Sequence, residues 1–187
     1  MPTHVALLRG VNVGGRNKVA MADLRDVVTS LGNTDVATYI QSGNVVFTSR
    51  EHDTAAVAAA LEQRIAESLG VRPSVVVLSA ADLAQVVADN PFPEDTDPKK
   101  LHAVLRSTEM GSDEVAAVAA AEQRAKEKGS RDEARVVGRT LFLHTPDGMG
   151  RSELTAQLTR AGTAKAFAAG TARNWSTVTK LLSLLDG

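Results

Sequence analysis

Two polar, glycine-punctuated stretches carry side chains that could bind an anion. They are LRGVNVGGRNK at 8–18 and YIQSGNVVF at 39–47, and each adjoins a run of apolar residues. Glycine lets backbone N–H groups approach a ligand, while arginine and lysine supply charged donors suited to phosphate or carboxylate. The candidate ligand-binding residues in these stretches are Arg9, Asn12, Gly14, Gly15, Lys18, Gln41, Ser42 and Asn44.

The glycine spacing matches no established phosphate-binding motif. Residues 8–18 form neither G-x-G-x-x-G nor G-x-x-x-x-G-K-[ST], which leaves dinucleotide and P-loop functions without support. A structural interpretation stands beside the functional one, because glycine and asparagine also shape turns and exposed cations are ordinarily solvated. Gly43-Asn44 in particular suits a two-residue hairpin turn, which would leave Gln41 and Ser42 without a structural task.

A third polar group lies in TARNWSTVTKLLSLL at 171–185. On a helix, Arg173, Thr177 and Lys180 would share the side opposite the apolar one, and Thr171 or Asn174 could cap the start. The N-terminal N–H groups of such a helix could add to an anion site, although a solvated polar face is the alternative. The candidates from the second half are Arg151, Arg173, Asn174, Thr177 and Lys180.

No motif names a reaction. The chain has no cysteine, its four histidines show no metal-ligand spacing, and neither H-E-x-x-H nor G-x-S-x-G occurs. We therefore predict no metal and no cofactor. An enzyme of unassigned reaction would use Lys18 or Lys180 as acid or base, which requires burial or a neighbouring cation to lower the lysine pKa. A protein-interaction or homodimer scaffold would instead show an exposed apolar patch.

Composition points to a soluble, cytoplasmic protein. The 187 residues include no long apolar segment and no basic leader, and the net charge of -1 gives no attraction to membranes or nucleic acid. Aromatic residues make up only 3% of the chain, which argues against base stacking as in RNA-binding plaits. The oligomeric state is not predictable from these features.

The order of expected elements repeats. Helices are expected around 24–31, 53–70, 79–90, 112–128, 150–161 and from about 174, and strands at 4–11, 36–41, 45–49, 73–78, 101–106, 134–137, 140–144 and 168–172. The segment NPFPEDTDP holds half of the six prolines and reads as a linker. We predict an α+β fold of two ferredoxin-like (α/β plait) halves, each βαββαβα, at 1–90 and 99–187, joined by a linker at 91–98.

Plait topology places the two opening stretches together. The first and second strands of a plait run parallel, so the segments that leave them emerge at the same end of the sheet. We therefore expect residues 9–18 to neighbour residues 41–44. Whether the second-half candidates complete the same site depends on how the halves pack.

Several pieces of the chain resemble a bacterial family known as domain of unknown function 1697. They are ALLRGVNVGGRNKVAMADLR at 6–25, TYIQSGNVVF at 38–47, NPFP at 90–93, HTPDGMGRSEL at 144–154 and TARNWSTVTKL at 171–181. The resemblance implies a small cytoplasmic protein with two ferredoxin-like halves and brings no established activity. Family members often carry lysine where this chain has Glu153, which would weaken an anion contact there, whereas Arg151 and Ser152 remain.

These observations lead to one functional hypothesis. We expect a protein that binds a small anionic molecule, a nucleotide or sugar phosphate ahead of a plain carboxylate, at the polar loops of the first half.

Overall fold

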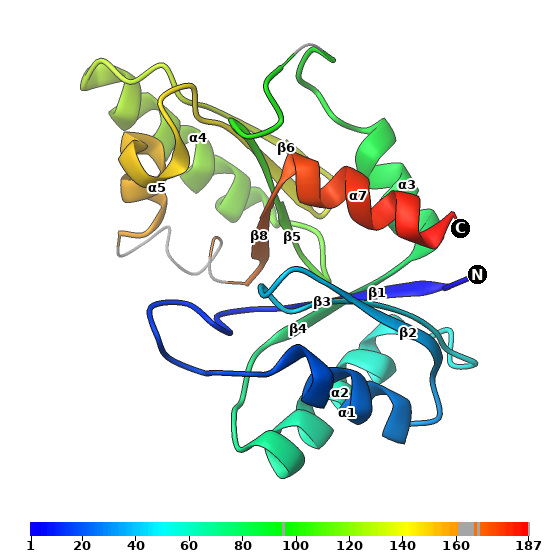
Figure 1. The fold of residues 1–187 in the computed structure, drawn as a ribbon. Coiled ribbons are helices and arrows are strands. Elements are labelled where there is room, and N and C mark those ends of the chain that lie inside the picture. The colour runs from blue at the N-terminus through cyan, green and yellow to red at the C-terminus, as the bar shows by residue number, and fades with distance from the viewer. Residues whose placement is uncertain (95, 161–166, 168, 187) are drawn as a thin grey trace. The chain divides into compact units, whose positions relative to one another are not determined.

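The computed structural model describes residues 1–94, 96–160, 167 and 169–186 (Figure 1). The chain forms two compact units, Met1–Gln85 with Thr179–Gly187, and Val86–Val178. Each unit contains one four-stranded antiparallel sheet with helices. The α+β fold of two similar halves predicted from the sequence is confirmed.

The first unit is built on a sheet with strand order β2-β3-β1-β4. Helices α1 and α2 cover one face of this sheet (Figure 1), where Leu24, Leu61 and Ile65 pack with Ala6 and Phe47 in the core. The elements are β1 (His4–Leu8), α1 (Met21–Ser30), β2 (Thr34–Tyr39), β3 (Asn44–Thr48), α2 (Thr54–Leu69) and β4 (Val75–Ser79). Helix α3 (Ala80–Ala88) begins in this unit, and its residues from Val86 onward are assigned to the second unit.

The second unit repeats the arrangement, with strand order β6-β7-β5-β8. Helices α4 and α5 pack on its sheet through Val118, Leu154 and Leu158, against Val104 and Leu141. The elements are β5 (Leu101–Leu105), α4 (Ser112–Glu127), β6 (Glu133–Val137), β7 (Thr140–His144), the 3-10 turn η1 (Met149–Arg151), α5 (Glu153–Leu158) and β8 (Thr171–Asn174). The last helix, α7 (Trp175–Leu185), begins in this unit, and its residues from Thr179 onward are assigned to the first unit. Equivalent strands occupy equivalent positions in the two sheets, as a duplication predicts.

The helix boundaries follow from local signals in the sequence. Asp53 caps α2 by accepting the N–H of Ala55 at 2.9 Å, and Gly70 ends that helix with φ +67°. Ser79 and Asp82 exchange backbone-to-side-chain hydrogen bonds of 3.1 Å and form the predicted capping box of α3. Within the described residues, no helix combines the length and apolar character needed to cross a membrane.

Two expectations about local structure are wrong. The first hairpin turns through four residues, 40–43, because Asn44 already pairs with Tyr39 as part of β3. Strand β8 begins at Thr171, so Arg173 lies on a strand and cannot share a helix face with Thr177 and Lys180. Of the expected segments 91–98, 150–161 and 168–172, the residues Asp95, Ala161 and Ala168 lie outside the described part of the chain.

Candidate functional site

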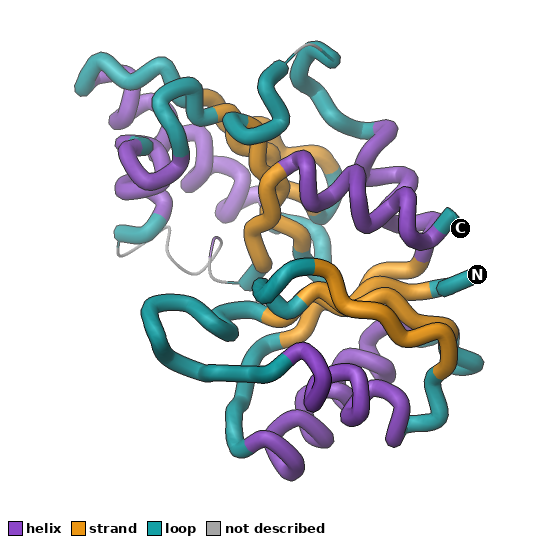
Figure 2. The backbone as a smooth tube through the Cα atoms, in the orientation of Figure 1, coloured by secondary structure: helices purple, strands orange, loops and turns teal. Residues whose placement is uncertain are grey.

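The connection between β1 and α1 is twice as long as its counterpart in the second unit. Twelve residues, 9–20, join β1 to α1, whereas six, 106–111, join β5 to α4. Figure 2 shows the longer connection as an extended loop. Its middle forms a small hairpin in which Val13 bridges Arg16, and Gly14 and Gly15 turn the chain with φ +58° and +75°.

Asn12 fixes this loop in place. Its Nδ2 donates to the carbonyl oxygens of Val19 and Gln41, both at 2.9 Å, and its Oδ1 accepts the Val19 N–H at 2.9 Å. Asn17 adds a bond from Nδ2 to the Gly10 carbonyl oxygen at 3.0 Å. The bond to Gln41 confirms that the loop and the 40–43 turn are neighbours. Because both Nδ2 hydrogens and the Oδ1 of Asn12 serve this network, the side chain has a structural task.

The 40–43 turn is packed directly against the end of β1. The Leu8 N–H donates to the Gly43 carbonyl oxygen at 2.8 Å, and the Gly43 backbone is closely covered by Leu8 and Val11. Asn44 is fully buried, and its Nδ2 donates to the Tyr39 carbonyl oxygen at 3.0 Å and to Ser42 Oγ at 2.8 Å. Asn44 and Ser42 therefore shape the turn, while Gln41 is exposed beside it.

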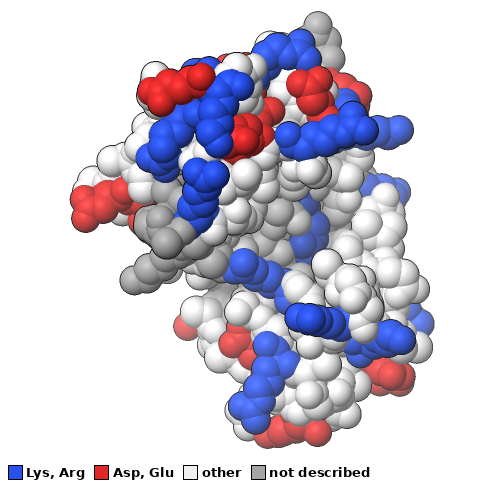
Figure 3. All heavy atoms as spheres, turned by 90° about the vertical axis from the view of Figure 1, so that its left-hand side faces the viewer, with Lys and Arg blue, Asp and Glu red and all other residues white. Residues whose placement is uncertain are grey.

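Three cations of the loop have no side-chain partner among the described residues. Arg9 is half-buried, Arg16 and Lys18 are exposed, and within the described part of the chain none of their side chains makes a hydrogen bond or ion pair. The loop itself contains no acidic residue. On the face shown in Figure 3, Lys and Arg side chains gather over the first unit, with Asp and Glu towards its edges. The loop is thus a concentration of unneutralised positive charge.

A cavity of about 460 Å³ lies between the loop and the turn. It is lined by Asn12, Gly15, Lys18, Val19, Ala20 and Gln41, four of which belong to the predicted set. Lys18 and the Gln41 side chain supply polar groups, and Val19 with Ala20 supplies an apolar wall. Two large apolar side chains are exposed on the same segments, Val13 at 66% and Ile40 at 51%.

In the second unit, the arginine equivalent to Arg9 pairs with a carboxylate of the protein itself. Arg106 follows β5 as Arg9 follows β1, but it is buried and its Nη2 donates to both carboxylate oxygens of Glu114 at 3.1 Å. Glu114 is the third residue of α4. The third residue of α1 is Asp23, which is exposed and makes no ion pair with Arg9. No carboxylate of the described residues therefore pairs with Arg9 as Glu114 pairs with Arg106.

The N-terminus of α5, beside Arg151, is already occupied by a carboxylate of the protein. Asp132 is buried and its Oδ2 accepts the Ser152 hydroxyl at 2.9 Å and the Leu154 N–H at 3.2 Å. Glu153 pairs with Lys128 at 2.6 Å, and the hydrogen bond from Lys128 lowers the pKa of Glu153. Arg151 is exposed and has no hydrogen-bond or ion-pair partner among the described residues.

The remaining predicted residues have individual roles near α7. Arg173 is buried on β8, its Nη1 donates to Thr171 Oγ1 at 2.7 Å and the Ala172 carbonyl oxygen at 2.9 Å, and burial lowers its pKa to about 10. Asn174 caps α7 by accepting the Thr177 N–H at 2.9 Å, as predicted. Thr177 is itself buried, whereas Lys180 is exposed on α7.

Two cations at the loop end of the first sheet were missing from the predicted set. Arg16 lies on the inserted hairpin, and its position directly after the two glycines was the available signal. Arg72 is exposed two residues before Ser74, whose carbonyl oxygen accepts the Arg9 N–H at 2.9 Å. No sequence motif connects Arg72 to the loop. Among the residues that the structure describes, no group of three His, Asp or Glu side chains could hold a metal.

Fold and site together define a duplicated α/β plait protein whose first half bears a structured basic loop. The chain belongs to the family described as "Protein of unknown function (DUF1697)", whose model matches residues 1–142. Its structure is similar to that of conserved bacterial protein SP0830 from Streptococcus pneumoniae, with 25% sequence identity, 98% of each chain covered and a TM-score of 0.75. None of the curated proteins matches the chain.

Proposed function

We propose that the protein binds a small anionic molecule, a nucleotide or sugar phosphate, between the 9–18 loop and the 40–43 turn. The observation that carries this proposal is a set of three cations, Arg9, Arg16 and Lys18, that have no side-chain partner among the described residues. They stand on a loop that Asn12 holds in shape, and Lys18 lines the cavity. Charged donors bind phosphate oxygens well, and Arg106 with Glu114 illustrates the pairing that Arg9 lacks.

The order of the loop favours binding. Fixing a residue's backbone costs about 1–2 kcal/mol, so a loop already held by side-chain bonds spares the ligand that cost. The hollow has a volume of about 460 Å³, large enough for a small molecule, and it is widely open to solvent. The apolar wall at Val19 and Ala20 would pack against the organic part of a phosphorylated metabolite. Inorganic phosphate has no such part and would gain nothing from this wall.

The alternatives have weaker support. Lys18 and Lys180 are exposed, whereas a lysine acid or base requires burial or a close cation. Two exposed apolar side chains, Val13 and Ile40, fall short of the several hundred Å² expected of a protein-interaction patch. We therefore propose ligand binding as the function and the cytoplasm as the location of the protein.

The proposal is tested by calorimetric titration of AMP, ATP and glucose 6-phosphate into the wild type and two variants. In the first variant, Arg16→Gln and Lys18→Gln are combined. The control is Arg50→Gln, which removes one charge rather than two, at a position away from the loop. Arg50 is an exposed cation on the segment after β3 that has no partner among the described residues. Loss of charged hydrogen bonds should weaken phosphate binding at least about tenfold in the double variant.

The control should bind as the wild type does. Equal weakening of phosphate binding in both variants would contradict a site at the loop, because it would mean that affinity depends only on the net charge of the unit. Absence of binding by all three compounds at about 100 mM salt would contradict the proposal, because screening is still incomplete there.

A further inference from the structure

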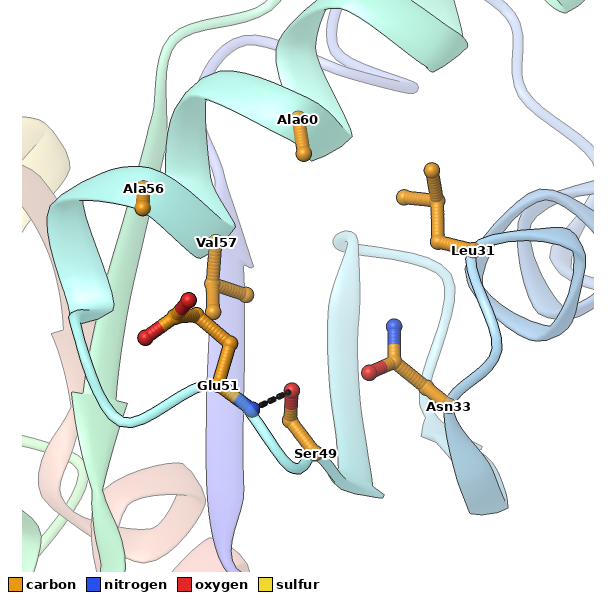
Figure 4. Close-up of a pocket in the computed structure, with 7 residues that line it drawn as sticks. All are labelled: Leu31, Asn33, Ser49, Glu51, Ala56, Val57 and Ala60. Carbon is orange, nitrogen blue, oxygen red and sulfur yellow. Dashed lines mark hydrogen bonds between the residues drawn. The ribbon is translucent and has the colours of Figure 1, made fainter.

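A second hollow of the first unit lies where β3 ends and α2 begins (Figure 4). Its lining mixes donors and acceptors, because Asn33 supplies an amide, Ser49 a hydroxyl and Glu51 a carboxylate. Such a mixture selects no class of ligand. The tip of the 9–20 loop is more specific, since it combines cations with an exposed aliphatic side chain.

The hairpin at the loop tip places an aliphatic and a cationic side chain together. Val13 and Arg16 are partners in an antiparallel bridge, and the side chains of directly opposed residues share a face. Val13 is 66% exposed. The Arg16 side chain is exposed as well and has no partner among the described residues. Gly14 and Gly15, which lie between them, carry no side chain that could cover this face.

Ile40 adds a second exposed aliphatic side chain, at a cost to the turn that carries it. Its φ of +50° lies in the left-handed region, which β-branched residues rarely adopt. The side chain is 51% exposed, so burial in the core does not offset the strain. Asn12 donates to the Gln41 carbonyl oxygen at 2.9 Å, and Val13 and Ile40 each directly adjoin one residue of this bond. Adjoining segments thus present both aliphatic side chains.

The surroundings of these side chains are positively charged. Arg9, Arg16 and Lys18 lie in the segment 9–22, and neither this segment nor the segment 36–50 contains an acidic residue. Figure 3 shows Lys and Arg side chains gathered over the first unit. The net charge of -1, from which no attraction to membranes is expected, sums over the whole chain and conceals this local excess.

A lipid bilayer fits this surface better than a macromolecule does. A stable protein partner would need about 800 Å² of surface on this side, which two isolated aliphatic side chains do not supply. An anionic bilayer needs no shaped counterpart. Its headgroups attract each nearby cation, and the boundary between headgroups and acyl chains takes up aliphatic side chains.

We propose that the 9–18 loop and the 40–43 turn dock on an anionic lipid bilayer. Val13 and Ile40 insert at the boundary of the acyl chains, and Arg16 and Lys18 lie against the anionic headgroups. Neither Val13 nor Ile40 lines the cavity proposed for a small molecule. Docking therefore does not rest on that function, although the two use the same cations.

The test is co-sedimentation of the protein with phosphatidylcholine vesicles, with and without about 30% phosphatidylserine. Each cation close to an anionic surface strengthens binding about fivefold, so Arg16 and Lys18 should favour the anionic vesicles about 25-fold. The salt concentration is kept at about 100 mM, where screening is incomplete. The double variant Arg16→Gln and Lys18→Gln should lose this preference.

A second double variant, Val13→Ser with Ile40→Asn, removes both aliphatic side chains and keeps every charge. Asparagine tolerates the left-handed backbone at position 40. Partition into anionic vesicles should fall at least about tenfold. The matched control is Val115→Ser, which removes an aliphatic side chain that is 39% exposed on α4 and should bind as the wild type does. Thermal midpoints show whether each variant is folded.

The same aliphatic double variant separates docking from the small-molecule site. Its calorimetric titration with AMP, ATP and glucose 6-phosphate should match that of the wild type, because the cavity lining is unchanged. Failure of vesicle binding with intact titrations would therefore overturn docking alone, and failure of the titrations with intact vesicle binding would overturn only the small-molecule site.

Insertion has a direct readout because the chain contains no cysteine. An environment-sensitive fluorophore on the Val13→Cys variant should shift its emission to shorter wavelength with anionic vesicles, whereas the same label on Val115→Cys should not. Three results would overturn the proposal. They are no preference for phosphatidylserine at about 1 mM lipid, equal partition of the aliphatic double variant and Val115→Ser, and an unshifted label at position 13.

Discussion

Gly43→Ala should destabilise the protein through one identifiable contact. A Cβ at this position would lie 2.6 Å from Val11 Cγ2 and 2.8 Å from Leu8 Cβ, closer than side chains tolerate. Leu8 cannot move away freely, because its N–H bonds to the Gly43 carbonyl oxygen at 2.8 Å. The φ angle of +73° adds a cost of about 1–2 kcal/mol for any residue with a side chain.

Gly10→Ala is the matched control. Gly10 has a similar φ of +69°, but a Cβ there would meet nothing within 4 Å. The control should lose only the backbone term, whereas Gly43→Ala should lose about 1–3 kcal/mol more through overpacking. For a chain of this length that difference lowers the unfolding midpoint by roughly 2–12 °C beyond the control.

The measurement is urea unfolding followed by circular dichroism, with thermal unfolding as a second readout. The two variants share the backbone effect, so their difference isolates the contact with Leu8 and Val11. Equal stability of Gly43→Ala and Gly10→Ala would refute the reasoning, because it would mean that the end of β1 yields to the added methyl group without cost.

Three further predictions follow from the polar contacts. Asn12→Ala removes the bonds to Val19 and Gln41 without changing charge, and calorimetry should show weaker phosphate binding; unchanged affinity would mean that loop order is irrelevant. Asp132→Ala should cost about 2–3 kcal/mol in urea unfolding, because charged hydrogen bonds at the start of α5 are lost, and a loss below that of an exposed aspartate control would contradict this. Burial lowers the pKa of His102, so the unfolded state binds more protons below about pH 6.5 and stability falls as pH drops through that range. His102→Gln should flatten this decline in urea midpoints, and an unchanged slope would refute the assignment.

Local signals predicted most of the secondary structure. Asp53 and Gly70 delimit α2 as expected, and the Ser79–Asp82 box starts α3, because caps depend on residues within one turn of the helix. The last strand was predicted at 168–172, and β8 lies at Thr171–Asn174. Its four residues include Arg173, and a buried arginine in a short strand has no distinctive apolar alternation.

The sequence also predicted only part of the candidate site. Gly15, Lys18 and Gln41 line one cavity, as expected from strand order. Asn12 lines it as well, but the polar side-chain atoms of Asn12 and Asn44 hydrogen-bond the backbone. Asparagine has the same donors and acceptor in either task, so the residue type alone could not assign one. Only the folded structure determines which of these atoms are already hydrogen-bonded.

The sequence by itself determined the order of elements, the duplication and the neighbourhood of the two polar stretches, because hydrophobic periodicity, caps and plait topology are properties of chain order. The tertiary structure decided which charges are neutralised. Arg106 and Arg9 follow equivalent strands, yet Arg106 pairs with Glu114, whereas Arg9 has no acidic partner in the part of the chain that the structure describes. That difference depends on side chains brought together from separate segments, and a linear pattern does not contain it.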